Sequence, residues 1–598
     1  MQSTENRNRR VIIVKKKAAK AAKAAKAAKV GMEMYDEYIE KSGLEPKNYQ
    51  REGVAFCLRR EKNEPVAAGG RIIRGGIIAD EMGLGKTIMM MGLILANFRR
   101  TLIVVPVALI AQWVAQIKKT IIDTGIKPDL SIAVFHGSTG KRSVVLSEVN
   151  GVMVWCHRPP KRRGGVVGGG GGGGAIDIVI TTYGCVGMEE PVAANSTKAP
   201  KAPKAPKAPK APTLSLLTFH PDRVIFDEAH HLRNKNSRLF KGAMKVVAVT
   251  GGAVVRPSVW IVTGTPIQNK ISDLKSLCYI LGFGVGDLMT DEKRRSIRDE
   301  YVLRRTKVSV GMVAGSDTGT DVVVQCAPRL QSLKHYKSQV PWTSESELDL
   351  SREIHQKARN TNDRAERLKL YTRMRQMCVW PALVRSSNAK DVTVSVTEED
   401  THGLSKDEYN IAISNQSKLD RVVATMVSER AAGKSIVFCH YRREMLQLRD
   451  MLLRCSSGGG VENEDDIAII DGTVGVRNRS RIFAATPTVL ILQIRTCSEG
   501  LNLQAYSNVY FVSPHWNPCV EDQAIARCYR MGQTKGVRVF RFYMTDFVDD
   551  EASASASASA SASASASADN YYISTLDHKC EEIQEKKRLL CNEFLCGV

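Results

Sequence analysis

Short, continuously apolar runs rich in Val and Ile alternate along the chain with longer segments in which charged and apolar residues mix. Such runs, separated by helical patterns, are typical of parallel sheets covered by helices on both faces. The alternation occurs twice. It predicts strands at 75–80, 101–106, 131–136, 176–183, 223–228 and 259–265, and again at 435–440, 467–472, 489–494, 508–513 and 537–542. We therefore expect an α/β fold with two parallel-sheet domains.

A charged, strand-poor stretch between the two series has a pattern that predicts mostly helix. Four low-complexity segments cannot form a core: a Lys–Ala repeat (15–29), a glycine run (168–174), a Lys–Ala–Pro repeat (201–212) and a Ser–Ala repeat (552–568). The expected organisation is a basic tail at 1–43, a first α/β domain at 44–284 with insertions at 164–174 and 198–212, a helical linker or protrusion at 285–410, a second α/β domain at 411–550, a Ser–Ala linker at 551–568 and a C-terminal helix at 569–598.

The 598-residue chain has a formal net charge of +24 that is unevenly distributed. Residues 1–30 hold ten Lys and Arg against one Glu, and the Lys–Ala–Pro run counted from residue 198 adds five lysines, which leaves about +10 for the rest. A polycationic tail on a moderately basic body favours a polyanionic partner. A tail that only keeps a generic enzyme in solution is the alternative.

The fourteen cysteines are scattered and form no CxxC pair, so the sequence predicts no structural zinc site. Unpaired cysteines with apolar neighbours are typical of a reducing compartment. The longest apolar run, "TIMMMGLILANF", is too short to span a bilayer, and "VIIV" near the start is too short for a signal peptide. We expect a soluble intracellular protein with no membrane partner.

The first chemistry-bearing motif is "GGIIADEMGLGKTIMMM", in which a buried strand leads through a Gly-rich turn into a helix that opens at Lys86 and Thr87. Backbone N–H groups at such a helix start bind phosphate, the Lys reaches the β- and γ-phosphates, and the Thr hydroxyl ligates Mg²⁺. The strict pattern has Gly where this chain has Asp80. A purely structural turn is the alternative.

The second motif, "RVIFDEAHHLRN", places adjacent carboxylates at the exposed end of a hydrophobic strand. Asp227 is suited to hold Mg²⁺, and Glu228 to orient and deprotonate an attacking water. A solvated pair of acids at a strand end is the alternative, but a phosphate loop upstream makes it the poorer explanation.

Further motifs follow in order: "TGTPIQN" (263–269), "LRRTK" (303–307), "EGLNL" (499–503) and "WNPCVEDQAIARCYRMGQ" (516–533). With the first two motifs, the set resembles the Swi/Snf family of DNA-dependent ATPases in helicase superfamily two, over about residues 44–545. "PHWNP" and "DEAHHLRN" look most like the branch of helicase-like transcription factor and post-replication repair translocases. That branch often carries a RING, which this sequence lacks. The sequence of residues 511–533 also resembles members of the family from large DNA viruses.

The resemblance implies that ATP and Mg²⁺ bind in a cleft between two RecA-like domains. The catalytic positions carried over are Lys86, Asp227, Glu228, Gln523, Arg527 and Arg530, with Thr87 and Asp227 as the metal ligands. The nucleotide-binding positions are Gln50, Asp80, Gly83, Gly85, Lys86, Thr87, Gly500 and Asn502. Arg527 and Arg530 match the family's arginine fingers. They stand three apart near the end of a pattern that predicts a helix, so they should point the same way. A surface helix whose arginines only contact phosphate or solvent is the alternative.

The resemblance also implies contacts with nucleic acid or coupling roles for Thr181, Thr182, Thr263, Gly264, Arg304, Arg305 and Trp516. Hydroxyls, amides and basic side chains along a cleft would hold phosphates without reading sequence. A solvated charge cluster is the alternative for Arg304 and Arg305, and a core position is the alternative for Trp516.

The function that the resemblance implies is an ATP-dependent double-stranded-DNA translocase that remodels protein–DNA complexes, with nucleosomes or other DNA-bound proteins as partners. A strand-separating DNA or RNA helicase and a non-hydrolysing nucleic-acid-binding scaffold are the alternatives. The lysine-rich tail favours the nucleus, with the cytoplasm or a viral factory as the alternative if the chain is viral.

Overall fold

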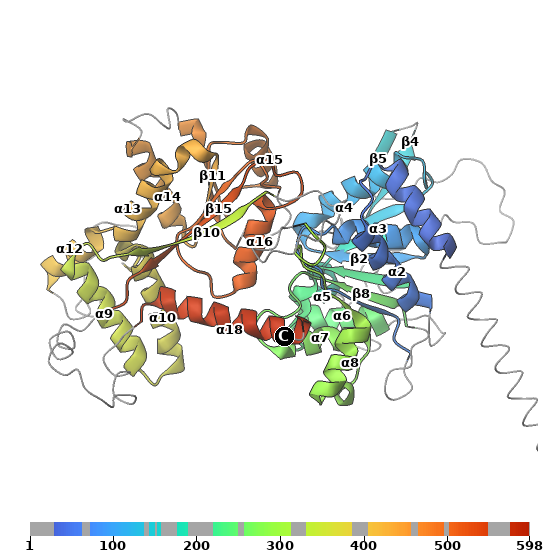
Figure 1. Cartoon of the computed structure of the whole chain (residues 1–598), viewed down its shortest axis with the longest axis horizontal. Helices are drawn as coiled ribbons and strands as arrows, with labels where there is room; N and C mark the ends of the chain where they lie inside the picture. The colour runs from blue at the N-terminus through green and yellow to red at the C-terminus, as the bar shows by residue number, and fades with distance from the viewer. Residues whose placement is uncertain are drawn as a thin grey trace, which may run out of the picture. The chain divides into compact units, whose positions relative to one another are not determined.

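The computed structural model describes residues 29–62, 72–136, 143–149, 152–156, 176–188, 219–248, 256–312, 331–384, 405–455, 464–495, 502–547 and 574–596 (Figure 1). The basic repeat of the N-terminal tail and the glycine, Lys–Ala–Pro and Ser–Ala segments predicted from sequence lie outside these residues. The chain divides into two compact units, Met1–Arg329 with Leu590–Val598, and Leu330–Leu589. Each unit is described by itself.

The first unit is built on a nine-stranded sheet in the order β5-β4-β3-β6-β2-β7-β8-β1-β9. Its strands are β1 (Gly75–Ile78), β2 (Thr101–Val105), β3 (Ile132–Phe135), β4 (Ser143–Val149), β5 (Val152–Cys156), β6 (Ile178–Thr182), β7 (Arg223–Asp227), β8 (Ser258–Val262) and β9 (Val302–Leu303). All neighbours pair in parallel except β3 with β4 and β4 with β5. The six strands predicted for this domain are confirmed, whereas β4, β5 and the two-residue β9 were not predicted.

Helices cover both faces of this sheet, as continuous apolar strands require. They are α2 (Asn48–Lys62), α3 (Lys86–Ala96), α4 (Ile110–Ile117), α5 (Tyr183–Met188), α6 (Arg238–Ala248), α7 (Ile271–Leu281) and α8 (Asp291–Tyr301). Figure 1 shows α2, α3 and α4 on one side and α5, α6 and α7 on the other. Successive residues of β2 alternate between them: Ile103 packs with the α2–α4 cluster and Val104 with the α5–α7 cluster.

The second unit is built on a six-stranded, all-parallel sheet in the order β10-β15-β14-β11-β13-β12. Its strands are β10 (Leu333–Val340), β11 (Ser435–Cys439), β12 (Ile467–Ile470), β13 (Val489–Gln493), β14 (Asn508–Phe511) and β15 (Val537–Met544). The five strands predicted here are confirmed. The strand β10 was missed because its residues, "LKHYKSQV", are mostly polar and exposed, as suits a strand at a sheet edge.

The helices of the second unit are α9 (Glu345–Asn360), α10 (Arg364–Val379), α12 (Lys406–Ser414), α13 (Ser417–Ser428), α14 (Arg442–Arg454), α15 (Val476–Ala485), α16 (Pro518–Cys528) and α18 (Leu576–Cys596). The stretch predicted to be mostly helical contains α8, α9, α10 and α12, and from residue 330 onward it belongs to the second unit. The other boundaries drawn from sequence stay predictions. Among the described residues, no helix combines the length and apolar character needed to cross a membrane.

Candidate nucleotide site and its arginine helix

The loop between β1 and α3 has the backbone of a phosphate-binding turn. Gly83 and Gly85 adopt left-handed conformations, with φ of 91° and 78°. A Cβ on Gly85 would lie 2.2 Å from Gln50 Nε2, which donates to Leu84 O at 3.1 Å. Position 85 therefore needs Gly for both its φ angle and the close approach of Gln50. Gln50, predicted to meet the adenine, thus lies directly against this loop.

Lys86 is the first residue of α3, and its side chain folds back over the loop. Its Nζ donates to Asp80 O at 2.8 Å and to Glu81 O at 3.2 Å. Burial lowers the pKa of Lys86, while the nearby carboxylates of Glu228, Asp80 and Asp227 oppose that shift. The structure therefore brings the predicted lysine and both predicted acids into one electrostatic cluster. Thr87 follows Lys86 in the first turn of the same helix.

Asp227 and Glu228 stand at the end of β7. One Asp227 oxygen, Oδ2, accepts a hydrogen bond from Trp113 Nε1 at 2.8 Å, and Oδ1 accepts one from the Glu228 N–H at 3.0 Å. Burial, followed by the charge of Glu228, raises the pKa of Asp227 to about 6. Glu228 has a φ of 51°, a left-handed conformation that is uncommon for a residue with a side chain. Such conformations persist where the surrounding structure imposes them, often at functional sites.

Asp80 contacts an arginine in this structure. It is fully buried and forms an ion pair with Arg305, whose Nε lies 3.1 Å from Oδ1. Arg305 also donates to Tyr49 O. Its neighbour Arg304 donates from Nη1 to Ala79 O at 2.6 Å and to Gly264 O at 3.3 Å. Asp80 and both arginines therefore support the phosphate loop through contacts within the first unit, and the nucleotide and nucleic-acid contacts predicted for them stay predictions.

The threonines predicted to meet nucleic acid have buried side chains. The Thr181 hydroxyl donates to Phe135 O at 2.8 Å, the Thr182 hydroxyl accepts from Cys185 N at 3.4 Å, and Thr263 Oγ1 accepts from Thr265 N at 3.2 Å. Side-chain exposure therefore gives no support to direct contacts through these three hydroxyls, and such contacts stay predictions.

The backbone of Gly264 passes close to the phosphate loop. A Cβ on Gly264 would lie 2.9 Å from Met82 Cγ and 3.5 Å from Lys86 Nζ. This proximity places the "TGTPIQN" segment beside the phosphate loop, and the coupling role predicted for it stays a prediction.

In the second unit, α16 ends earlier than the sequence suggested. Its last residue is Cys528, and Tyr529 leaves the helix with φ −89° and ψ 79°. Arg530 lies in the turn that follows, so the expectation that Arg527 and Arg530 share one helix face was wrong. The two guanidinium groups remain near each other, so the charge of Arg527 adds to burial in lowering the pKa of Arg530. Proximity therefore arises from a tight turn after the helix.

A buried polar network fixes the start of α16. Glu521 is fully buried and accepts hydrogen bonds from Arg541 Nε at 2.9 Å, Gln584 Nε2 at 2.7 Å and His515 N at 2.8 Å. Gln584 belongs to α18, which also reaches Trp516 O through Lys587 Nζ at 2.7 Å. The sequence analysis missed this network. The two arginines inside the run "VRVFRFYM" were the available signal, because a buried arginine needs an anionic partner.

The remaining predicted positions are less central. Gln523 is buried on α16, and its Nε2 has no hydrogen-bond partner among the described residues. Trp516 is half-buried, with the Arg375 guanidinium 4.9 Å from its ring centroid, so its contacts resemble those of a packing residue. Asn502 is exposed and accepts from Gln504 N at 3.4 Å, whereas Gly500 lies outside the described residues.

The first unit fits ATP with Mg²⁺ by its donor chemistry. The helix α3 has no acidic residue in its first turn, so its N-terminus can bind an anion. It follows the glycine loop, in which a Cβ at Gly85 would clash with Gln50. The Thr87 hydroxyl and the Asp227 carboxylate are oxygen donors, which Mg²⁺ prefers, and Mg²⁺ sites of this kind are completed by substrate phosphates and water.

Comparison with known proteins finds a matching domain family in each unit. Residues 49–288 match the SNF2-related domain, and residues 417–532 match the helicase conserved C-terminal domain. A probable global transactivator from Orgyia pseudotsugata multicapsid polyhedrosis virus is 26% identical over 84% of this chain and 86% of the relative. The DNA excision repair protein ERCC-6-like of Danio rerio is 24% identical over 85% of this chain and 35% of its own length.

An uncharacterized ATP-dependent helicase of Mycoplasma genitalium is 24% identical over 84% of this chain and 40% of its own length. The chain thus spans well under half of these two cellular relatives. Among solved structures, the Sulfolobus solfataricus SWI2/SNF2 ATPase core in complex with dsDNA matches with 18% identity and a TM-score of 0.31, over 86% of this chain and 91% of that chain. The two matched domains, together with the motifs of the phosphate loop and the acid pair, show that the chain belongs to the Swi/Snf family of helicase-like, DNA-dependent ATPases.

Proposed function

We propose that this protein is an ATP-dependent double-stranded-DNA translocase that remodels protein–DNA complexes. The observation that carries the proposal is the electrostatic cluster of Lys86 with Asp227 and Glu228 around the glycine loop. A scaffold that only binds nucleic acid has no need for a buried lysine facing two acids or for a strained Glu228.

Each residue then has a chemical task. Lys86 and the first amides of α3 bind the ATP phosphates, and Gln50 binds the edge of the adenine. Thr87 and Asp227 hold Mg²⁺, which neutralises phosphate charge when bound. Glu228 orients the attacking water and accepts its proton. Hydrolysis also requires Arg527 and Arg530 of the second unit, whose guanidinium groups offset the charge that develops on the transferred phosphoryl group.

Binding to DNA is proposed to be electrostatic and independent of sequence, because the chain carries a net charge of +24. Two relatives are named for excision repair and for global transactivation. A chromatin, repair or transcription complex on DNA is accordingly the proposed target, with the nucleus as the proposed location.

The test is the steady-state ATPase rate without nucleic acid and with duplex DNA, single-stranded DNA or RNA. We expect duplex DNA to give the largest stimulation, at least about tenfold, and Lys86→Ala and Glu228→Gln to abolish it. A rate stimulated mainly by single strands or RNA would favour the helicase, and a flat rate unaffected by either variant would favour the scaffold.

A second assay separates translocation from strand separation. We expect ATP-dependent displacement of the third strand from a DNA triplex without release of a labelled strand from a simple duplex. Release of the duplex strand at a comparable rate would reject the translocase proposal and support the helicase.

A further inference from the structure

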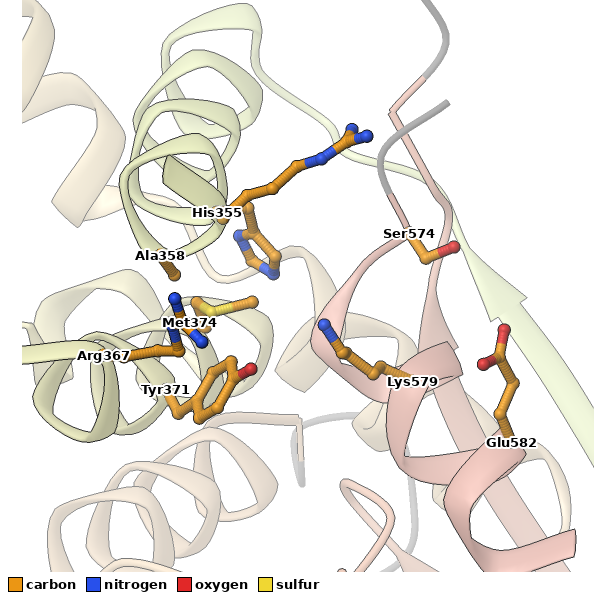
Figure 2. Close-up of a pocket in the computed structure, with 9 residues that line it drawn as sticks. His355, Ala358, Arg367, Tyr371, Met374, Ser574, Lys579 and Glu582 are labelled. Atoms are coloured by element: carbon orange, nitrogen blue, oxygen red, sulfur yellow. The ribbon is translucent and has the colours of Figure 1, made fainter. Parts of the chain in front are cut away.

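A pocket of about 390 Å³ lies in the second unit, on elements that carry none of the family motifs. It is formed by α9, α10 and the residues around the start of α18 (Figure 2). The side chains that determine its chemistry are His355, Arg359, Arg367, Tyr371, Lys579 and Glu582. Pockets of about 300–1,000 Å³ are the usual size for small-molecule sites.

The pocket has a positive balance of charge. The lining side chains include three cations, Arg359, Arg367 and Lys579, and one carboxylate, Glu582, and the Asp546 carboxylate lies close enough to His355 to act on its pKa. His355 is neutral at pH 7, because burial lowers its pKa to about 4. Its ring is also held at both nitrogens, with Nδ1 2.7 Å from Ser351 O and Nε2 3.1 Å from Leu576 N.

Two of the cations are available to a ligand. Arg367 is oriented by donation from Nε to Thr361 O at 3.2 Å, and its Nη1 has no acceptor within the part of the chain that the structure describes. The Lys579 ammonium likewise has no acceptor among these residues and lies 5.6 Å from the Tyr371 ring centroid. Figure 2 shows the Lys579 ammonium and the Tyr371 hydroxyl pointing toward each other across the pocket, with His355 above them in this view.

The Tyr371 ring, which faces Lys579 across the pocket, packs against a second aromatic ring. The Tyr371 ring packs at 6.2 Å from the Trp516 ring, centroid to centroid, so it is held between Lys579 and the segment that precedes α16. A supported aromatic ring and an oriented guanidinium reduce the entropy that a ligand would have to overcome on binding.

We propose that this pocket binds a small phosphorylated molecule with at least one phosphate monoester, of the class of sugar phosphates. A phosphate monoester carries about two negative charges near pH 7, whereas a phosphodiester of DNA carries one, so a monoester gains more from a lining in which cations outnumber the carboxylate. The planar guanidinium of Arg367 suits phosphate oxygens, and Tyr371, Ser574 and Glu582 supply partners for sugar hydroxyls.

Isothermal titration calorimetry with fructose 1,6-bisphosphate tests the proposal, with ADP and Mg²⁺ saturating the nucleotide site. We expect binding to the wild-type protein and a loss of at least about tenfold in affinity for Arg367→Gln/Lys579→Gln and for Lys579→Gln alone. The matched control Lys369→Gln/Lys586→Gln changes exposed lysines on the same two helices outside the pocket and should bind normally. Absence of binding, or binding that the pocket variants do not weaken, would overturn the proposal.

A second arm identifies the source of the phosphate. The same variants are titrated with a short DNA duplex, which we expect them to bind as the control variant does. If the pocket variants weaken duplex binding and the bisphosphate does not bind, the pocket is a DNA-backbone contact and the proposal is wrong.

Discussion

Trp113 Nε1 lies 2.8 Å from Asp227 Oδ2 and links α4 to the acid that is proposed to hold Mg²⁺. The indole is almost completely buried, and its donor orients one oxygen of the carboxylate while the Glu228 N–H orients the other. Supporting hydrogen bonds of this kind commonly affect metal affinity about 10- to 100-fold.

Trp113→Phe keeps an aromatic ring, although a smaller one, and removes this donor. We expect the Mg²⁺ concentration for half-maximal ATPase activity to rise about tenfold, with most of the rate recovered at high Mg²⁺. Direct titration of Mg²⁺ with a bound ATP analogue should show the same shift. Trp342→Phe, which removes a hydrogen bond to Thr545 O in the second unit, is the control. Equal Mg²⁺ dependence in both variants would show that Trp113 only packs.

The ion pair of Asp80 with Arg305 should dominate the stability of the phosphate loop. Arg305→Met leaves a fully buried carboxylate without its cation, which typically costs about 3–5 kcal/mol in the free energy of unfolding. Urea denaturation measures this loss. Arg51→Met breaks an exposed pair with Asp36 and should cost less than about 1 kcal/mol. If Arg305→Met instead weakens DNA binding without destabilising the protein, the DNA contact predicted from sequence is correct.

Gly85→Ala should impair nucleotide binding through the loop conformation. The new methyl group would meet Gln50 Nε2 at 2.2 Å, and the φ of 78° disfavours any side chain. We therefore expect the free energy of nucleotide binding to become less favourable by about 1–3 kcal/mol. Binding of a fluorescent ATP analogue reports the effect. Gly286→Ala introduces a methyl group into open space at an ordinary φ and should change nothing measurable. Similar effects of both substitutions would contradict the assigned role of the loop.

The raised pKa of Asp227 predicts a specific pH dependence of stability without nucleotide and Mg²⁺. Its folded pKa of about 6 exceeds the unfolded value of about 3.9, so the folded state binds more protons between these pH values. Ionised Asp227 therefore destabilises the fold progressively as pH rises from about 4 to 6, by about 2–3 kcal/mol in total. Relative to wild type, Asp227→Asn should be more stable at pH 7.5 than at pH 4.5. A stability difference that does not vary with pH would contradict the shift.

The hydrogen bond from Gln584 to Glu521 should position α16, the helix that carries Arg527. Gln584→Leu removes a donor to a buried carboxylate, and we expect kcat to fall about tenfold while the KM for ATP changes little. The conservative variant Gln584→Asn is expected to recover part of the rate, and Lys586→Ala, on the exposed face of α18, should behave as wild type. An unchanged kcat for Gln584→Leu, or a rise in KM alone, would show that α18 does not act on α16.

The strands were predictable where burial makes a run continuously apolar, as in β2 or β14. The edge strand β10 could not be predicted in this way. It pairs with a neighbour on one side only, and most of its side chains are exposed, so its sequence is mostly polar. The phosphate loop and acid pair were predictable because their chemistry demands particular residues at fixed spacing. The contacts of Asp80 with Arg305, Asp227 with Trp113 and Glu521 with Gln584 were not, since they join residues 225, 114 and 63 positions apart that only the fold brings together.

The pairing of β10 with β15 has a consequence for synthesis of the chain. Leu333–Val340 is made about two hundred residues before Val537–Met544, its only strand partner among the described residues. During synthesis on the ribosome, the backbone N–H and C=O groups of this segment therefore have no strand partner until Val537–Met544 has been made. Its lysines and exposed polar side chains then act as protection, because a charged edge resists pairing with other nascent chains.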